Sequence, residues 1–196
     1  MLRIQRFSGS HITPYIPDLA RLRIQVFREF PYLYNGNLMY EEKYLQRYLK
    51  SNLTVVVIAF DGRDVVGAST GMPMSDEDAP IRRPFELAGY DLSDIFYFGE
   101  SVLLADYRGQ GTGVAFFRER EAHAWKHGYK ITTFCAVDRP ADHPRRPAGY
   151  QSLDAFWLRR GYTRKPELRS LFNWRDLDEE TESPKQLTYW LKHHPD

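Results

Sequence analysis

The feature of this sequence that most restricts its fold is a glycine-rich turn between an apolar strand and a helix. The apolar run 95–104 predicts the strand, the turn occupies 108–113, and a helical pattern continues to about His127. Gly128 then ends the helix, as glycine commonly does at a C-terminus. Such a turn aims several backbone N–H groups at one point, and the helix N-terminus adds about +0.5 of a charge there. We therefore expect this turn to bind phosphate.

The turn differs from the two best-known phosphate loops. It does not end in Gly-Lys-Ser/Thr, so an ATP-binding P-loop is not predicted. Its glycines stand at 109, 111 and 113, and no suitable acidic strand end follows, so the dinucleotide fingerprint is not met either. The spacing Arg-x-x-Gly-x-Gly alone carries little information. Its position directly after a strand and before a helix makes it informative.

The remaining pattern predicts one α+β domain over residues 1–196. No repeat, low-complexity tract or linker divides the chain. Strands are expected at 2–7, 53–60, 65–72, 95–104, 130–137, 168–176 and 185–193, the last two forming a final hairpin at about 168–193. Helices are expected at 16–30, 39–49, 83–88, 109–127 and 150–160.

Composition restricts the functional class. The formal net charge is +1, so bulk electrostatics does not favour a nucleic acid or an anionic membrane as partner. Cys135 is the only cysteine, so neither an intrachain disulfide nor a cysteine-rich zinc site can form. His123 and His127 share a predicted helix, but no third ligand is evident and no metal is expected. Neither a signal peptide nor the ~20 apolar residues of a membrane span is found, so a cytoplasmic location is expected.

Two segments resemble the signatures of a known family. Residues 107–113, Tyr-Arg-Gly-Gln-Gly-Thr-Gly, are similar to the pyrophosphate motif of the GNAT N-acetyltransferases. Residues 155–162, Ala-Phe-Trp-Leu-Arg-Arg-Gly-Tyr, are similar to that family's second signature, a helix before the sixth strand. The order of elements agrees with the family over nearly the whole chain, and the specific part is 95–162. The resemblance implies a mixed, mostly antiparallel seven-stranded sheet with helices on both faces and with the fourth and fifth strands splayed.

The resemblance also implies a co-substrate and a reaction. The co-substrate is acetyl-CoA, and the reaction is direct transfer of acetyl to a primary amine of a small molecule or peptide, without metal. The residues expected to bind acetyl-CoA are Val102, Leu103 and Leu104 by backbone, and Arg108, Gly109, Gln110, Gly111, Thr112 and Gly113 at the pyrophosphate. A homodimer is left open. The alternatives are a non-catalytic acyl-CoA-binding regulator, and a transferase for another acyl group or acceptor.

Glu100 is the first catalytic candidate. An amine of pKa ~10.4 is protonated near pH 7, which disfavours its nucleophilic form by about 4–5 kcal/mol. A carboxylate can take that proton as the amine attacks. Glu100 is a lone acid in an apolar strand, and GNAT members often carry an acid or a histidine near this position. The alternative is an acid on the polar side of an edge strand.

Tyr150 is the second catalytic candidate. In the family's helix signature a tyrosine usually follows Phe156, whereas this chain has Trp157 there. An indole N–H can donate a hydrogen bond but is not a usable proton source. Tyr150, which is expected to open the same helix, is the candidate to hydrogen-bond the departing thiolate.

Tyrosines between the first two predicted helices are the candidates for acceptor binding. They are Tyr32, Tyr34 and Tyr40, with Glu41 and Glu42 beside them, and the family commonly builds its acceptor pocket here. Two nearby acids would favour a cationic amine; a surface helix start with exposed acids explains them equally well. The loop 138–147, with three arginines and His143, either binds an anion or is solvated.

Overall fold

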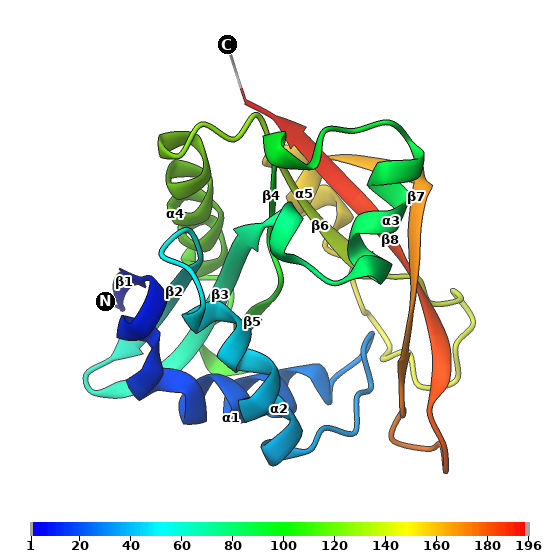
Figure 1. Cartoon of the computed structure of the whole chain (residues 1–196). Coiled ribbons are helices and arrows are strands. Elements are labelled where there is room, and N and C mark those ends of the chain that lie inside the picture. Colours follow the sequence, from blue (N-terminus) through cyan, green and yellow to red (C-terminus); the bar gives the residue numbers. More distant parts are fainter. Residues whose placement is uncertain (1, 195–196) are drawn as a thin grey trace.

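Eight strands form one sheet in the computed structural model, which describes residues 2–194 (Figure 1). They are β1 (Arg3–Phe7), β2 (Val55–Asp61), β3 (Asp64–Pro73), β4 (Ile95–Tyr97), β5 (Ser101–Leu103), β6 (Ile131–Val137), β7 (Thr163–Trp174) and β8 (Ser183–His193). Their order is β1-β2-β3-β4-β6-β8-β7, with β5 paired to β3. The β4–β6 pair is parallel and the other pairs are antiparallel, as expected for a mixed, mostly antiparallel sheet.

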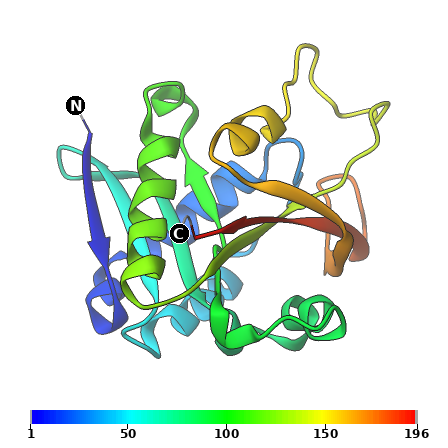
Figure 2. The ribbon, with the colours of Figure 1, turned by 90° about the horizontal axis from the view of Figure 1, so that it is seen from above.

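Helices cover both faces of this sheet (Figure 2). They are α1 (Ile16–Phe27), α2 (Leu38–Leu45), α3 (Ala79–Leu87), α4 (Thr112–Lys126) and α5 (Asp154–Arg159), with short 3-10 turns between them. The side chains of β2 alternate between two cores. Val56 and Ile58 pack with Leu22 of α1, whereas Val57 packs on the other face with Phe116 of α4. Burial on both faces explains why the sequence of β2 is a nearly continuous apolar run.

The predicted strand 95–104 is interrupted in its middle. Phe98 N–H donates to the Thr133 carbonyl of β6 (2.8 Å), whereas Gly99 N–H donates to the Thr70 carbonyl of β3 (3.2 Å). A Cβ at Gly99 would lie 2.3 Å from Tyr48 Oη, so glycine is needed at this break. Beyond the break β5 pairs with β3 alone, and its other edge separates from β6. This break produces the expected splay and makes eight strands out of the seven predicted.

Several boundaries differ from the sequence-based expectation. Helix α1 ends at Phe27 rather than Phe30, because the chain folds back and Tyr34 N–H donates to the Phe27 carbonyl (2.8 Å). Helix α5 begins at Asp154, so Tyr150 lies in the loop before it rather than at its start. The final hairpin begins at Thr163, because β7 resumes pairing with β8 across a register shift.

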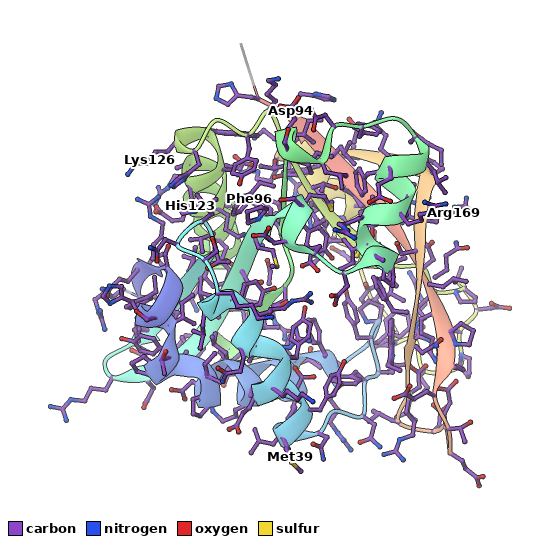
Figure 3. The ribbon with its side chains drawn as sticks, in the orientation of Figure 1. Met39, Asp94, Phe96, His123, Lys126 and Arg169 are labelled. Carbon is purple, nitrogen blue, oxygen red and sulfur yellow. The ribbon has the colours of Figure 1, made fainter. Side chains whose placement is uncertain are left out.

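His123 is a core side chain of α4. Its Nε2 lies 2.9 Å from the Leu53 carbonyl, and its ring packs against Phe96 with centroids 5.5 Å apart (Figure 3). Burial lowers the pKa of His123 to about 4, so the ring is neutral near pH 7. Within residues 2–194 no group of three or more His, Cys, Asp or Glu side chains is placed to hold a metal. Over the same range no helix has the length and apolarity to cross a membrane.

Candidate functional site

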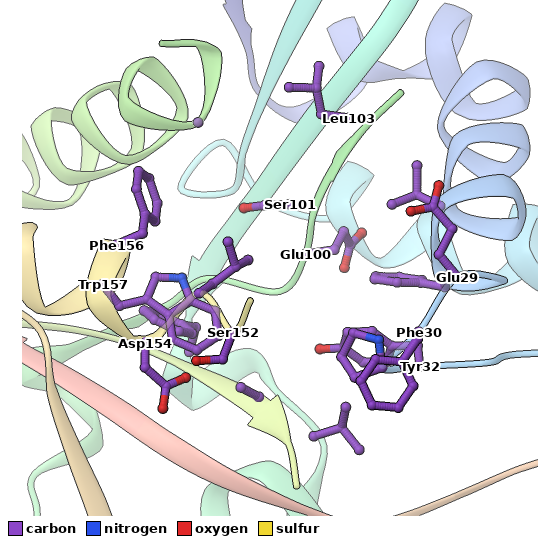
Figure 4. A pocket seen from close by; sticks show the side chains of 18 of the residues that line it. Glu29, Phe30, Tyr32, Glu100, Ser101, Leu103, Ser152, Asp154, Phe156 and Trp157 are labelled. Carbon is purple, nitrogen blue, oxygen red and sulfur yellow. The ribbon is translucent and has the colours of Figure 1, made fainter. Parts of the chain in front are cut away.

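A cleft of about 1540 Å³ opens where β5 and β6 diverge (Figure 4). Its walls come from the end of α1 and the loop after it, from the strand break, from the glycine turn with the start of α4, and from the segment that joins β6 to α5. The cleft brings together eight of the predicted site residues: Tyr32, Glu100, Leu103, Arg108, Gly109, Gly111, Gly113 and Tyr150.

The glycine turn exposes backbone donors to this cleft. Gly109 and Gly111 have φ of +75° and +85°, and nothing lies within 4 Å of a Cβ built on either. The first turn of α4 is closed by Ala115 N–H donating to the Gly111 carbonyl (3.1 Å), and no side chain caps the helix. The N–H groups of 112–114 therefore have no acceptor within the helix. Open space above unpaired N–H groups is the arrangement that binds an anion.

The side chain of Arg108 is engaged within the protein. Its guanidinium pairs bidentately with Glu29 (2.7 and 3.0 Å), and its Nε donates to the Leu103 carbonyl (3.0 Å). Gln110 is engaged as well, donating to the Asp106 carbonyl (3.2 Å). The candidate anion site is therefore made by the backbone of the turn, and Arg108 links the turn to the end of α1.

The free edge of β5 faces the cleft. Leu104 N–H donates to the Val66 carbonyl of β3 (3.0 Å), and Val102 lies in the same register against β3. Because the residues of an antiparallel strand direct their backbone groups alternately to either side, those of Ser101 and Leu103 face away from β3, toward the splay. Among the three strand residues predicted to bind by backbone, Leu103 is thus the one whose backbone faces the splay, although its carbonyl accepts from Arg108 Nε (3.0 Å). The backbone of Ser101, which was not among the predicted site residues, faces the same way.

Glu100 reaches the cleft from a buried position. It is 6% exposed, and its Oε2 lies 2.8 Å from Arg23 Nη1 and 3.4 Å from Tyr48 Oη. Arg23 also pairs with the fully buried Glu41, so two carboxylates share one guanidinium. Glu100 Oε1 has no hydrogen-bond partner in the described chain. This unpaired oxygen is itself buried, and Glu100 lines the cleft.

Cys135 of β6 lines the cleft but is a poor nucleophile. Its Sγ lies 3.2 Å from Tyr97 Oη. Burial raises the pKa of the thiol to about 12, so the reactive thiolate is scarce near pH 7. Its burial and its contact with Tyr97 are those of a structural thiol.

Tyr150 and Trp157 stand on the wall formed by the segment between β6 and β7. The Tyr150 ring packs edge-on against Phe30 (4.7 Å), and the Arg146 guanidinium lies 4.9 Å above it. Burial raises the pKa of Tyr150, so its hydroxyl remains a neutral donor. Trp157 packs against the core residue Phe134, with ring centroids 5.0 Å apart, and lines the cleft (Figure 4).

The predicted acceptor tyrosines separate in the structure. Tyr32 lines the cleft, Tyr34 lies in a β-bridge with Asp176 outside it, and Tyr40 is 59% exposed and also outside it. Arg139 fixes the loop that carries Tyr32. Its guanidinium is bidentate to Asp176 (2.8 and 2.9 Å) and donates to the Tyr32 carbonyl (2.8 Å).

Replacing Arg139 by methionine is expected to destabilise the fold by about 3 kcal/mol, because Asp176 would keep a buried charge with one partner fewer. Arg139 and Asp176 side chains are 9% and 6% exposed. Arg118→Met is the control, because Arg118 is 72% exposed and pairs with its neighbour Glu119. Chemical denaturation measures the stability of both variants. Equal midpoints for the two variants would contradict the assignment of Arg139 as the residue that fixes this loop.

Comparisons with known proteins agree with this geometry. No protein-family model matches the chain, and no curated protein matches it by sequence. Solved structures do match. A ribosomal-protein-alanine N-acetyltransferase from Brucella melitensis is 15% identical, with a TM-score of 0.65 and coverage of 98% of this chain and 100% of that one. An IAA acetyltransferase from Bacillus cereus is 11% identical, with a TM-score of 0.56 and coverage of 99% and 100%.

A third structure extends the comparison. A GCN5-related N-acetyltransferase from Kribbella flavida is 12% identical, with a TM-score of 0.57 and coverage of 97% of this chain and 98% of that one. Matches of this kind run over nearly the full length of both chains, through the splayed strands and the glycine turn. The chain therefore has the fold of the GNAT N-acetyltransferases.

Proposed function

We propose that this protein transfers the acetyl group of acetyl-CoA to a primary amine by direct attack in the cleft. One observation carries the proposal: the glycine turn and the buried acid Glu100, one of whose oxygens is unpaired, line the same cleft from either end of β5. The solved acetyltransferases that share the fold support it. A carboxylate without the glycine turn would not select CoA. A glycine turn without a general base would bind acyl-CoA without transferring its acyl group.

The co-substrate fits the cleft as follows. The pyrophosphate binds at the N–H groups of the glycine turn, where Gly109 and Gly111 leave open space. The pantetheine amides pair with the open edge of β5 at the backbone groups of Ser101 and at the N–H of Leu103. Phe156 supplies an apolar wall on the side of α5. The thioester then lies at the strand break, beside Glu100.

The reaction needs one base and no covalent enzyme intermediate. The nitrogen lone pair of the amine attacks the thioester carbon, and the carbonyl π electrons move to oxygen. When the carbonyl reforms, the C–S bond breaks and sulfur leaves with the electron pair as a thiolate. Glu100 accepts the proton that nitrogen loses, and that proton finally reaches the thiolate. A thiol of pKa ~8.5 leaves tolerably well as its anion, so a hydrogen-bond donor is a sufficient aid.

Tyr150→Phe is expected to slow acetyl transfer at least tenfold and to leave acetyl-CoA binding unchanged. Tyr150 lines the cleft and its raised pKa keeps it a neutral hydrogen-bond donor toward a departing thiolate. Thiol release measures the rate, and calorimetry measures the affinity. The edge contact with Phe30 survives this substitution, because the ring is retained. Full activity of the variant would show that the thiolate leaves unaided or that another group assists it.

The proposed function is tested by combining a binding and a turnover assay on the wild-type chain. Thermal denaturation with acetyl-CoA measures binding, and thiol release across a panel of small amines and amino-terminal peptides measures turnover. We expect stabilisation by acetyl-CoA and release of CoA with at least one amine. Stabilisation without release for any amine would favour the acyl-CoA-binding regulator instead. The absence of both would reject the proposal.

A further inference from the structure

Arg120 of α4 carries a buried charge beside the strand break. It is 1% exposed, and among residues 2–194 no carboxylate lies within ion-pair distance of it. Its guanidinium donates to the carbonyls of Thr70 (3.1 Å) and Glu100 (3.2 Å), which also accept from the backbone N–H groups of Gly99 and Thr70. Burial lowers the pKa of Arg120 to about 10, so the side chain is still a cation near pH 7.

The remaining contacts of Arg120 are the Phe116 carbonyl, which accepts from its Nε (3.3 Å), two aromatic rings and one hydroxyl. The guanidinium carbon lies 4.2 Å from the Phe98 ring centroid and 5.1 Å from that of Phe117. Its Nη2 donates to Ser101 Oγ (2.8 Å). A buried cation is costly unless its donors are satisfied, and the carbonyls and ring faces serve that purpose. Ser101 is different, because its hydroxyl lies at the cleft.

Ser101 and Glu100 point to opposite sides of β5 (Figure 4). Glu100 points toward α1, whereas the exposed Ser101 points toward α4 and α5, where the cleft wall includes Phe156 and Trp157. Since Arg120 uses a lone pair of Ser101 Oγ, the hydroxyl proton is free, and no acceptor for it is found in the described part of the chain. A charged donor on the oxygen also strengthens the O–H as a donor.

We propose that Ser101 Oγ–H donates a hydrogen bond to the carbonyl oxygen of the bound thioester. This inference rests on the proposed acyl-CoA site. Oxygen is the partner rather than sulfur, because a thioester sulfur is a weak acceptor. As the amine attacks, negative charge develops on that oxygen, and a donor already held in place by Arg120 stabilises it without reorganising. Ser101 is then a catalytic residue, and Arg120 holds its hydroxyl in position.

Ligand binding tests this inference without any acceptor. Acetyl-CoA contains the carbonyl and CoA does not, so Ser101→Ala should weaken acetyl-CoA binding about fivefold and leave CoA binding unchanged. Isotope-edited infrared spectra of bound acetyl-CoA labelled with ¹³C at the carbonyl provide the second readout. The carbonyl band should move to higher wavenumber in Ser101→Ala, because the bond is less polarised.

Two further variants separate the hydroxyl from packing. Ser101→Thr keeps a hydroxyl and should retain both the affinity ratio and the band position. Ser69→Ala on β3 removes a buried hydroxyl that has no partner and does not line the cleft, so both readouts should be unchanged. An equal loss for acetyl-CoA and CoA in Ser101→Ala, or an unmoved carbonyl band, would overturn the inference.

The outcome is separable from that of the proposed function. A wild type that binds neither ligand would remove the acyl-CoA site and this inference together. In another outcome, the wild type binds acetyl-CoA, Ser101→Ala loses the polarisation of its carbonyl, and no amine is turned over. That outcome would support the hydrogen bond and reject the transferase function.

Discussion

Gly113→Glu is expected to abolish acetyl-CoA binding while the protein remains folded. A Cβ at Gly113 meets only Phe156 Cζ, at 3.4 Å, so the side chain can be accommodated. A carboxylate in the first turn of α4 is favourable to the helix, because it interacts with the positive end of the helix dipole. The same carboxylate would occupy the place of the pyrophosphate. The variant therefore separates loss of the ligand from loss of the fold.

Gly111→Glu should have the same effect on binding with an added structural cost. Gly111 has φ +85°, which a glutamate adopts at a cost of about 1–2 kcal/mol. Gly89→Glu is the matched control, because Gly89 has φ +79°, has nothing within 4 Å of an added Cβ, and does not line the cleft.

Thermal denaturation with acetyl-CoA distinguishes these variants. A ligand at a hundred times its dissociation constant adds ~2.7 kcal/mol of stability. Wild type and Gly89→Glu should show this stabilisation, whereas Gly111→Glu and Gly113→Glu should show none. Undiminished stabilisation of both turn variants would place the acyl-CoA site elsewhere.

The turn was predictable because its signal is local. An apolar run, a glycine spacing and a helical period lie within about thirty residues, and the structure places the turn between a strand and a helix, as predicted. The two positive φ values of Gly109 and Gly111 explain the local need for glycine. The layered fold was predictable for the same reason, since the spacing of apolar residues along the chain indicates where strands and helices alternate.

The strand break was not readable from local pattern alone. Residues 96–102 look like one apolar strand, and the interruption arises because Phe98 bonds to β6 and Gly99 to β3, which are distant in sequence. The resemblance to a family, rather than the residue pattern, supplied the expectation of a splay there.

Three buried or partly buried arginines around the site were not predicted from the sequence, unlike Glu100 and Arg108. Arg120 occupies a helix that also carries the exposed Arg118, and its burial depends on carbonyls of Thr70 and Glu100, which are distant in sequence. Arg23 and Arg139 likewise have partners at least 18 residues away, Glu41 and Asp176. A lone arginine that falls on the apolar side of a helix is the signal that could have identified Arg120 as buried.

Glu100→Gln is expected to lower turnover by ~10²–10⁴ and to leave acetyl-CoA affinity nearly intact, because the amide cannot accept the proton of the amine. The fold should tolerate this change. Arg23 is shared by Glu100 and Glu41, so removing one carboxylate leaves a one-to-one ion pair with the other. Steady-state thiol release with the best amine of the panel measures turnover, and thermal stabilisation by acetyl-CoA measures binding.

Glu41→Gln is the matched control for this prediction. Glu41 is fully buried, pairs with the same arginine and, like Glu100, has an Oε1 without a partner in residues 2–194, but it does not line the cleft. If Glu100 receives the proton, Glu41→Gln should retain turnover within about tenfold of wild type, since the reacting carboxylate is untouched. Equal losses in the two variants would show that the ion-pair network acts by holding α1 against β5. Wild-type turnover in Glu100→Gln would show that Glu100 is a structural acid and that the base, if there is one, lies on another wall of the cleft.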